Sequence, residues 1–96
     1  MIKKYPYKEA AGMLKIIAHP VRLNIITLLD RKRMSVNEIC AAAGAKQSIT
    51  SQHLNAMADK GILRREREEN RVYYSIKKKE VFNILKCIKG CCNKRK

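Results

Sequence analysis

The stretch KQSITSQHLNAMADKGILRRE, residues 46–66, decides how this chain folds. At about 100° per residue, a helix over this stretch gathers its apolar side chains on one face. That face comprises Thr50, Leu54, Met57 and Ala58. The opposite face carries short side chains that form hydrogen bonds, namely Ser48, Ser51, Gln52, Asn55 and Asp59. Gly61 ends the helix and arginines follow at once, so the pattern predicts one face in a core and another free for a polar partner.

A short helix and a tight turn precede that helix. Residues 35–38, SVNE, have the form of a capping box, in which the Ser hydroxyl and the Glu carboxylate bond free backbone amides at a helix start. Gly44 then supplies a residue that can turn left-handed after the last helical turn. The spacing is that of a helix-turn-helix over about residues 35–60, whose second helix can lie in the major groove of DNA.

Two extended runs follow the helix-turn-helix. ILRRERE and RVYYSI are rich in β-branched, aromatic and alternating residues, and ENR supplies a polar turn between them. They predict a β-hairpin over about residues 62–76, in which Val72, Tyr74 and Ile76 face the core. Arginines stand on its strands and tip, at positions 64, 65, 67 and 71. A helix-turn-helix followed by a basic hairpin is a winged helix, whose wing meets phosphates or a minor groove.

Further helices are predicted on both sides of this unit. Apolar residues recur at helical spacing from Glu9 to Ala18, and Pro20 suits the first turn of a second helix. A last helix covers about residues 79–92. The predicted fold class is therefore mainly α with a small β-hairpin (α+β). It is a winged helix-turn-helix in a single domain over residues 1–96, with its helices packed around a three-helical core.

The composition favours a nucleic-acid partner. The 96 residues include 22 Lys and Arg against 8 Asp and Glu, and the resulting formal net charge of +14 attracts polyanions, with an anionic membrane surface as the second candidate. No apolar run approaches the roughly 20 residues of a membrane span, and the N-terminus lacks the apolar core of a signal peptide. We therefore expect a cytoplasmic protein with no membrane partner. We expect no enzyme activity, because the sequence has no His-Cys-acid constellation and no glycine-rich phosphate loop.

The segments AHPVRLNIITLLD, SVNEIC, QSITSQHLNAMADKGIL and REENRVYYSI together resemble the ArsR/SmtB winged-helix repressors, over roughly residues 10–92. The resemblance implies a homodimer built from the first and last helices, at about residues 8–18 and 79–92. It also implies that this dimer binds a double-stranded DNA operator of imperfect two-fold symmetry and is released by an effector. By position, Arg71 matches the wing tip of the family. The family's DNA-reading helix is matched by Gln47, Ser48, Ser51, Gln52 and His53.

The predicted DNA interface combines polar side chains of the second helix with arginines of the wing. Ile49 lies on the polar side and can meet a thymine methyl group, whereas Gln and Asn can bond adenine. Lys46 is a poor helix cap where the family commonly has Ser or Thr, and it can instead reach a phosphate. His53 lies between the two faces, where local packing competes with base reading. The residues predicted to contact DNA are Lys46, Gln47, Ser48, Ile49, Ser51, Gln52, His53, Asn55, Arg65, Arg67 and Arg71.

Three of the four cysteines, Cys87, Cys91 and Cys92, lie on and just past the last helix. Cys87 and Cys91 are four residues apart and so neighbours on one side of a helix, where two sulfurs can share a soft ion. Gly90 lets a third thiolate approach. DNA binding itself needs no cofactor, and As(III), Sb(III) or another soft metal ion is a candidate effector at these cysteines. Cys40 lies on the core stripe of its helix, and we expect it to be structural.

The other effector sites of the resembled family are not matched. Ser35 and Asn37 stand where its arsenic or lead site has cysteines, and residues 77–89 lack the Asp and His ligands of its zinc site. Thr27 stands where persulfide-sensing members have a second cysteine. Three readings stay open: release by a metal or metalloid ion, a redox or persulfide response of the same cysteines, or DNA binding with no effector. If the cysteines are incidental, the dimer stripe consists of Val81, Leu85, Ile88 and Cys92.

Overall fold

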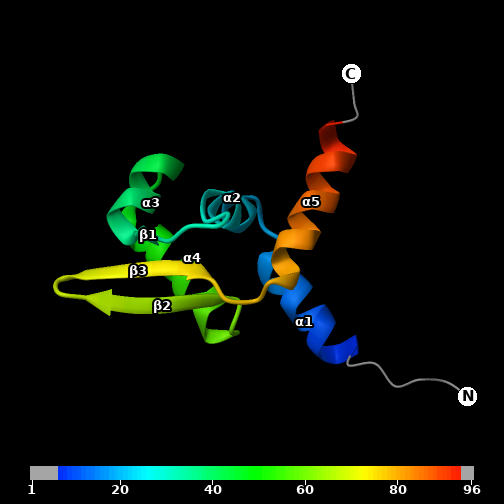
Figure 1. Cartoon of the computed structure of the whole chain (residues 1–96), viewed down its shortest axis with the longest axis horizontal. Coiled ribbons are helices and arrows are strands. Elements are labelled where there is room, and N and C mark those ends of the chain that lie inside the picture. Colours follow the sequence, from blue (N-terminus) through cyan, green and yellow to red (C-terminus); the bar gives the residue numbers. More distant parts are fainter. Residues whose placement is uncertain (1–6, 94–96) are drawn as a thin grey trace, which may run out of the picture.

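The computed structural model describes residues 7–93, apart from the side chains of residues 92 and 93. Five helices and three strands make up this part of the chain (Figure 1). In order they are α1 (Tyr7–Ile17), α2 (Pro20–Leu28), β1 (Met34–Ser35), α3 (Val36–Ala43), α4 (Gln47–Asp59), β2 (Leu63–Glu68), β3 (Arg71–Ile76) and α5 (Glu80–Asn93). The winged helix-turn-helix predicted from the sequence is confirmed, with α3 and α4 as the helix-turn-helix and β2 and β3 as the wing.

The ends of the helices follow from local sequence signals. His19 caps α2, because its imidazole Nδ1 accepts a hydrogen bond from the backbone amide of Val21 at 3.1 Å. The predicted capping box is present at α3: Ser35 Oγ accepts from the amide of Glu38 at 3.2 Å, and the Glu38 carboxylate accepts from the amide of Ser35 at 2.8 Å. Gly44 follows α3 with a φ of 66°, a left-handed conformation that glycine adopts without steric cost.

The core is formed by α2, α3 and α4, and α5 adds to it. Its fully buried apolar side chains are Ile25, Ile26, Leu29, Ile39, Leu54, Met57, Ile62 and Val81. Leu85, one turn after Val81, is only 6% exposed and belongs to the same cluster. The interpretation of Val81 and Leu85 as part of a dimer stripe is therefore wrong, because α5 turns both side chains into the core of its own chain. Ile88 stays 38% exposed, and the side chain of Cys92 lies outside the described residues.

The sheet has one strand more than the sequence predicted. Its order is β1-β3-β2, and the antiparallel strand β1 pairs Met34 with Tyr74 and Ser35 with Tyr73. A strand of two residues has no alternation to read, and Ser35 is at the same time the cap of α3. At Ser35 the sequence therefore shows the helix-capping pattern and no pattern of a strand. The pairing holds the start of the helix-turn-helix against the middle of β3.

The wing is a regular hairpin in which each residue of β2 pairs with one residue of β3. Tyr74 is buried, and Val72 and Ile76 are half-buried against the core, so the predicted inward side of β3 is confirmed. The chain reverses at the tip through Glu69, whose φ of 54° is unusual for a residue other than glycine. The hairpin therefore projects from the core as a narrow arm, rooted by its inward side chains.

The two ends of the molecule are formed by different helices and strands (Figure 1). The wing projects on one side, next to α3, whereas α1 and α5 lie on the other. None of the helices within residues 7–93 combines the length and the apolar character needed to cross a bilayer. The residues predicted to contact DNA and the cysteines predicted to bind an effector thus lie at opposite ends of the molecule.

Candidate nucleic-acid interface

The polar face predicted for α4 is present. Thr50, Leu54 and Met57 are fully buried against the core. The other side of the helix carries exposed or half-buried side chains: Gln47, Ser48, Ile49, Ser51, Gln52 and Asn55. Ile49 is 46% exposed, so one apolar side chain stands among hydrogen-bonding ones. Such a surface can bond base edges and also pack against a thymine methyl group.

The start of α4 has no side-chain cap. Lys46 occupies the N-cap position with extended backbone, and its side chain makes no capping hydrogen bond. A Ser or Thr hydroxyl there would accept from a backbone amide of the first turn. With Lys46 instead, an exposed ammonium group lies at the positive end of the helix dipole. This combination suits a phosphate rather than a stabilising cap.

Alternation along β2 sorts its charges onto two sides of the wing. Arg65 and Arg67 share one side of the wing. Arg65 donates a hydrogen bond to a side chain of α4, the predicted recognition helix, so this side of the wing faces α4. Glu66 and Glu68 lie on the other side, where both accept hydrogen bonds from Arg33. Arg64 and Arg71 also lie on the side of the acids, because Arg64 alternates with Arg65 and Arg71 pairs with Glu68. The side of the strands that faces α4 thus carries Arg65 and Arg67 and no acid. An anionic partner lying against α4 requires this distribution.

Three side chains join the recognition helix to the wing. Asn55 Oδ1 accepts from Arg65 Nη2 at 2.7 Å and from the Tyr74 hydroxyl at 3.1 Å, and that hydroxyl accepts from Arg65 Nε at 3.1 Å. The hydrogen bond with Tyr74 raises the pKa of the Arg65 guanidinium. Because Tyr74 is buried, the triangle is anchored in the core. DNA contacts by Asn55 and Arg65 stay predictions, and the structure adds a positioning role that the sequence did not indicate.

His53 is half-buried and bonded within the domain. Its Nδ1 accepts from Arg22 Nε at 2.9 Å, and Arg22 also donates to the backbone oxygen of Ile16 at 2.9 Å. The rings of His53 and His19 lie with their centroids 4.6 Å apart. Burial, followed by the charges of Arg22 and His19, lowers the pKa of His53. These contacts tie α4 to the start of α2, and a DNA contact by His53 stays a prediction.

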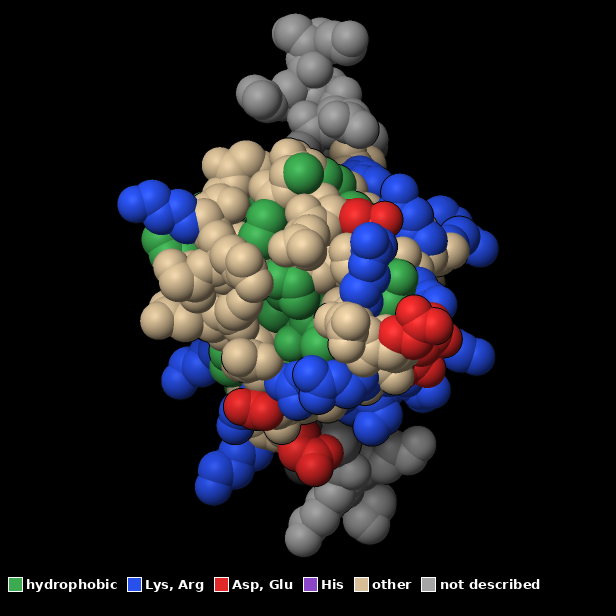
Figure 2. All heavy atoms as spheres, turned by 90° about the vertical axis from the view of Figure 1, so that its left-hand side faces the viewer, with side chains coloured by type: hydrophobic (Ala, Val, Ile, Leu, Met, Phe, Trp, Pro, Cys, Tyr) green, Lys and Arg blue, Asp and Glu red, His purple; other side chains and the backbone are tan. Residues whose placement is uncertain are grey.

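A cleft of about 150 Å³ lies where α3, the start of α4 and the wing tip meet. Gln47, Asn70 and Arg71 line it together with the first residues of α3. Asn70 and the start of α3 were not predicted as part of the interface, because a turn position and a helix start have no periodic pattern. Figure 2, viewed from the wing side, shows a broad uncharged area bordered by Lys and Arg side chains, with acidic side chains gathered toward the right and the lower edge of this face. The arrangement can seat a polyanion along an uncharged, hydrogen-bonding strip.

Two of the three cysteines predicted to bind metal have described side chains, and both are exposed. Cys87 and Cys91 are free thiols one helical turn apart on α5. Cys92 belongs to α5, but its side chain lies outside the described residues. Within the described part of the chain, no three His, Cys, Asp or Glu side chains lie close enough to hold a metal ion. Cys40 is a half-buried free thiol on α3.

The terminal helices leave apolar side chains uncovered. Leu14 of α1 is 48% exposed, and Ile88 of α5 is 38% exposed. By helical spacing, Ile88 shares its side of α5 with Ile84 and Cys91, and Cys87 lies next to Ile84 and Cys91 at the edge of this side. The two thiols therefore stand on or at the edge of an apolar helix face rather than on a charged one.

Known proteins share both the sequence and the fold. Residues 19–65 match the family described as bacterial regulatory protein, arsR family. The chain is 37% identical over 84 residues to the HTH-type transcriptional regulator YgaV of Escherichia coli (strain K12), which covers 86% of this chain and 85% of that protein. The crystal structure of the AntR antimony-specific transcriptional repressor matches with a TM-score of 0.82 and 30% identity, over 96% of this chain and 82% of that one. Mb0332 from Mycobacterium bovis, a homodimeric winged helix-turn-helix DNA-binding domain, shares the fold with a TM-score of 0.80 at 24% identity, over 99% of this chain and 93% of that one.

Proposed function

Because the chain belongs to the ArsR family of bacterial regulatory proteins and is a DNA-binding transcriptional repressor of that type, we propose that a soft metal or metalloid ion releases it from its operator. The ion binds cysteines of α5. One observation carries the proposal: the two exposed thiols of α5 are one helical turn apart, and Cys91 shares a helix face with Ile88, an apolar residue that this chain leaves uncovered. A ligand there acts on a surface that a second copy of the chain needs.

In this proposal the outer face of α4 lies in the major groove. Gln47, Ser51 and Gln52 reach base edges, and Ile49 packs against a thymine methyl group. The wing arginines contact phosphates or the adjacent minor groove. The exposure of these side chains and the sorting of charge along β2 support this mode. The interaction takes place in the cytoplasm, with no membrane involved.

A second copy of the chain covers the apolar surface of α1 and α5. Exposed Leu14 and Ile88 support this, as does the small core that a chain of 96 residues can build alone. A two-fold dimer holds its two copies of α4 about 34 Å apart, one turn of B-DNA. Such a dimer reads an operator whose halves are related by two-fold symmetry.

The effector is As(III), Sb(III) or another soft ion, bound by Cys87 and Cys91 with Cys92 as the third thiolate. The spacing of one turn and the exposure of both described thiols support this site, and AntR, of similar fold, is an antimony-specific repressor. An ion here changes the packing of the dimer and hence the spacing of its two α4 helices, a coupling of about 1–3 kcal/mol.

The test is DNA release measured by fluorescence anisotropy, on a duplex that the full chain itself selects from random sequences. Arsenite and antimonite should lower the affinity of the wild type by roughly tenfold or more. The triple variant Cys87→Ser/Cys91→Ser/Cys92→Ser should bind DNA equally well and ignore both reagents. Cys40→Ser, a cysteine on α3, is the matched control and should respond like the wild type.

Other outcomes separate the remaining readings. Release by a persulfide or an oxidant, but by no metal or metalloid ion, would identify the cysteines as redox sensors. Unchanged affinity with arsenite, antimonite, cadmium, zinc and persulfide would leave a DNA-binding module with no effector. Release of the triple variant by arsenite would place the site elsewhere. A flat dependence of log affinity on log salt concentration would contradict the phosphate contacts of the wing.

A further inference from the structure

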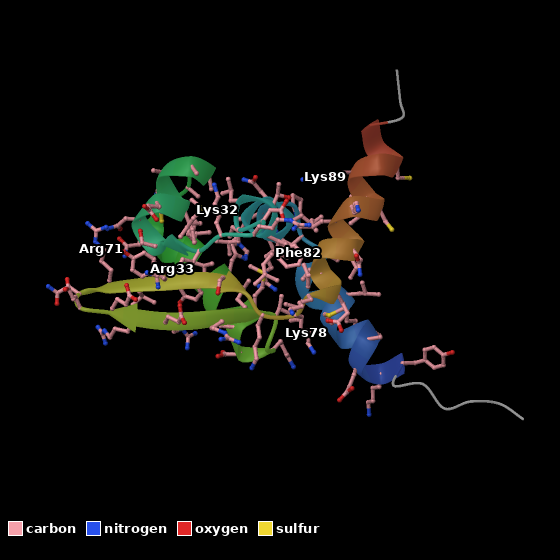
Figure 3. All side chains as sticks on the ribbon, viewed as in Figure 1. Lys32, Arg33, Arg71, Lys78, Phe82 and Lys89 are labelled. Carbon is pink, nitrogen blue, oxygen red and sulfur yellow. The ribbon has the colours of Figure 1, made fainter. Side chains whose placement is uncertain are left out.

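Arg33 lies outside both the recognition helix and the wing, in the connection between α2 and β1. Its Nη2 donates to a carboxylate oxygen of Glu68 at 2.8 Å, and its Nη1 donates to Glu66 at 3.4 Å. The guanidinium carbon also lies 4.2 Å from the centre of the Tyr73 ring, within cation–π range. Figure 3 shows Arg33 over the hairpin, between the wing and the helices above it. One side chain therefore contacts both strands of the wing.

The backbone of Arg33 is itself held in place. Met34, the next residue, begins β1 and pairs with Tyr74 of β3. The arginine is thus attached to the sheet that it contacts, and its side chain spans only from the edge strand to the wing. The hydrogen bond with Glu68 raises the pKa of Arg33, and the same bond lowers the pKa of the Glu68 carboxyl group. Both groups carry their charges at neutral pH.

The wing is held from both sides. On the side of α4, Arg65 bonds Asn55 and the buried Tyr74. On the opposite side, Arg33 bonds the two acids of β2 and stacks on Tyr73. A hairpin that projects from the core can swing about its base, and these two arginines restrain the swing in opposite directions.

We propose that Arg33 is a positioning residue for DNA binding, which holds the wing so that Arg67 and Arg71 meet the duplex while α4 occupies the groove. Arg33 acts through Glu66 and Glu68 and does not itself contact DNA. The inference rests on the DNA-binding mode proposed above. The proposal also gives Glu66 and Glu68, two acidic residues, a role in binding an anionic partner.

Removing the charges of Glu66 and Glu68 should change DNA affinity in opposite directions, depending on whether Arg33 positions the wing or only the net charge matters. Removing two negative charges raises the affinity of a protein for DNA if only long-range electrostatics matters. Positioning by Arg33 predicts the reverse: Glu66→Gln/Glu68→Gln lowers affinity by roughly threefold to tenfold. The dependence of log affinity on log salt should also become less steep in this variant, because the displaced wing loses phosphate contacts.

The same experiment includes Arg33→Ala, Arg33→Lys and the triple variant Arg33→Ala/Glu66→Gln/Glu68→Gln. Arg33→Ala should lose as much affinity as the acid-free variant, and the triple variant should lose no more than either. Arg33→Lys keeps the charge but not the planar fork, so it should restore only part of the affinity. Lys32→Ala, the adjacent cation, is the matched control and should bind more tightly than Arg33→Ala. Thermal unfolding midpoints of all variants show whether the fold is intact.

Tighter binding by Glu66→Gln/Glu68→Gln, or equal losses in Lys32→Ala and Arg33→Ala, would overturn the proposal. So would additive losses in the triple variant, because they would mean that Arg33 contacts DNA directly. If the wild type bound no duplex at all, the failure would belong to the proposed DNA-binding mode instead. The two failures are therefore distinguishable in one set of titrations.

Discussion

The reading half of the molecule, which comprises α3, α4 and the wing, is joined by side-chain hydrogen bonds between its own elements. The terminal half, α1 and α5, is contacted by Arg22 at the backbone oxygen of Ile16 and by Arg31 over the ring of Phe82, yet it leaves apolar side chains exposed. In the reading half a capping box, the Asn55–Arg65–Tyr74 triangle and the Arg33 contacts join neighbouring elements. In the terminal half the described side chains include exposed Leu14, Ile88, Cys87 and Cys91. The reading surface is therefore organised within one chain. In the proposed dimer, the terminal surface is completed by a second copy of the chain.

The largest expected effect is on the core that both halves share. Leu54→Ala removes a fully buried side chain of α4 and should lower the free energy of unfolding by about 3 kcal/mol at every protein concentration. Leu14→Ala should lower it by less than about 1 kcal/mol at low concentration, because its side chain is 48% exposed within one chain. The Leu14→Ala deficit should grow as the concentration rises and dimers form. Urea unfolding at two concentrations measures both, and equal deficits for Leu14→Ala at both would contradict a dimer surface there.

A charge on the uncovered face of α5 should separate the two copies. Ile88→Glu places a carboxylate among apolar side chains, so we expect a monomer whose DNA affinity is lower by about 100-fold, since two half-sites no longer bind together. Analytical ultracentrifugation and anisotropy measure the two effects. Asn83→Glu puts the same charge at an exposed position about 140° around α5 from Ile88 and should leave both unchanged. A dimeric Ile88→Glu variant would rule out this face.

Loss of the link between α4 and the wing should have a smaller effect. Asn55→Ala removes the oxygen that accepts from Arg65 and Tyr74, so the wing loses its restraint on the side of α4. We expect Asn55→Ala to lower DNA affinity by roughly fivefold. The double variant Asn55→Ala/Arg65→Ala should bind DNA only a little more weakly than Asn55→Ala alone. Anisotropy titrations of the two single variants and the double variant measure this coupling. Fully additive losses would show that Asn55 contacts the bases independently of the wing.

One buried polar group of the reading half has no hydrogen-bond partner among the residues that the structure describes. The Thr50 hydroxyl oxygen is fully buried and makes no hydrogen bond with any described residue. Thr50→Val keeps the shape and removes that polar atom, so it should raise the free energy of unfolding by about 1 kcal/mol. Urea unfolding measures the gain, and Thr50→Ser, which retains the hydroxyl, should show none. A loss of stability in Thr50→Val would mean that the hydroxyl is bonded in solution.

The smallest expected effect is a dependence of stability on pH. The pKa of His53 is lowered in the folded chain by burial and by the charges of Arg22 and His19, so the unfolded chain binds the proton more readily. Stability should therefore be complete above a pH of about 6.5 and should decline as the pH falls below it. His53→Gln keeps an acceptor for Arg22 and should flatten this part of the profile. Urea midpoints between about pH 5.5 and 7.5 measure it, and an unchanged slope in the variant would assign the dependence to another group.

Much of the reading half was predictable because its signals are local. The capping box at Ser35, the turn at Gly44 and the wheel over Thr50, Leu54 and Met57 are all written within a few residues. The strand β1 was not predictable, because two residues have no period. The dimer-stripe reading failed at Val81 and Leu85, since a helical stripe shows that a face is buried but not whether the same chain or another one buries it.

The sequence by itself determined the family, the order of the helices and of the two hairpin strands, and the polar face of α4, because capping, periodicity and turn chemistry act between residues close in the chain. Only the tertiary structure decided what each polar side chain does. It joined Asn55 to Arg65 and Tyr74, bonded His53 to Arg22, and brought Arg33 over two acids more than thirty residues away. Hydrogen bonds and ion pairs depend on distances between atoms, and those distances are set by how the helices and the wing pack.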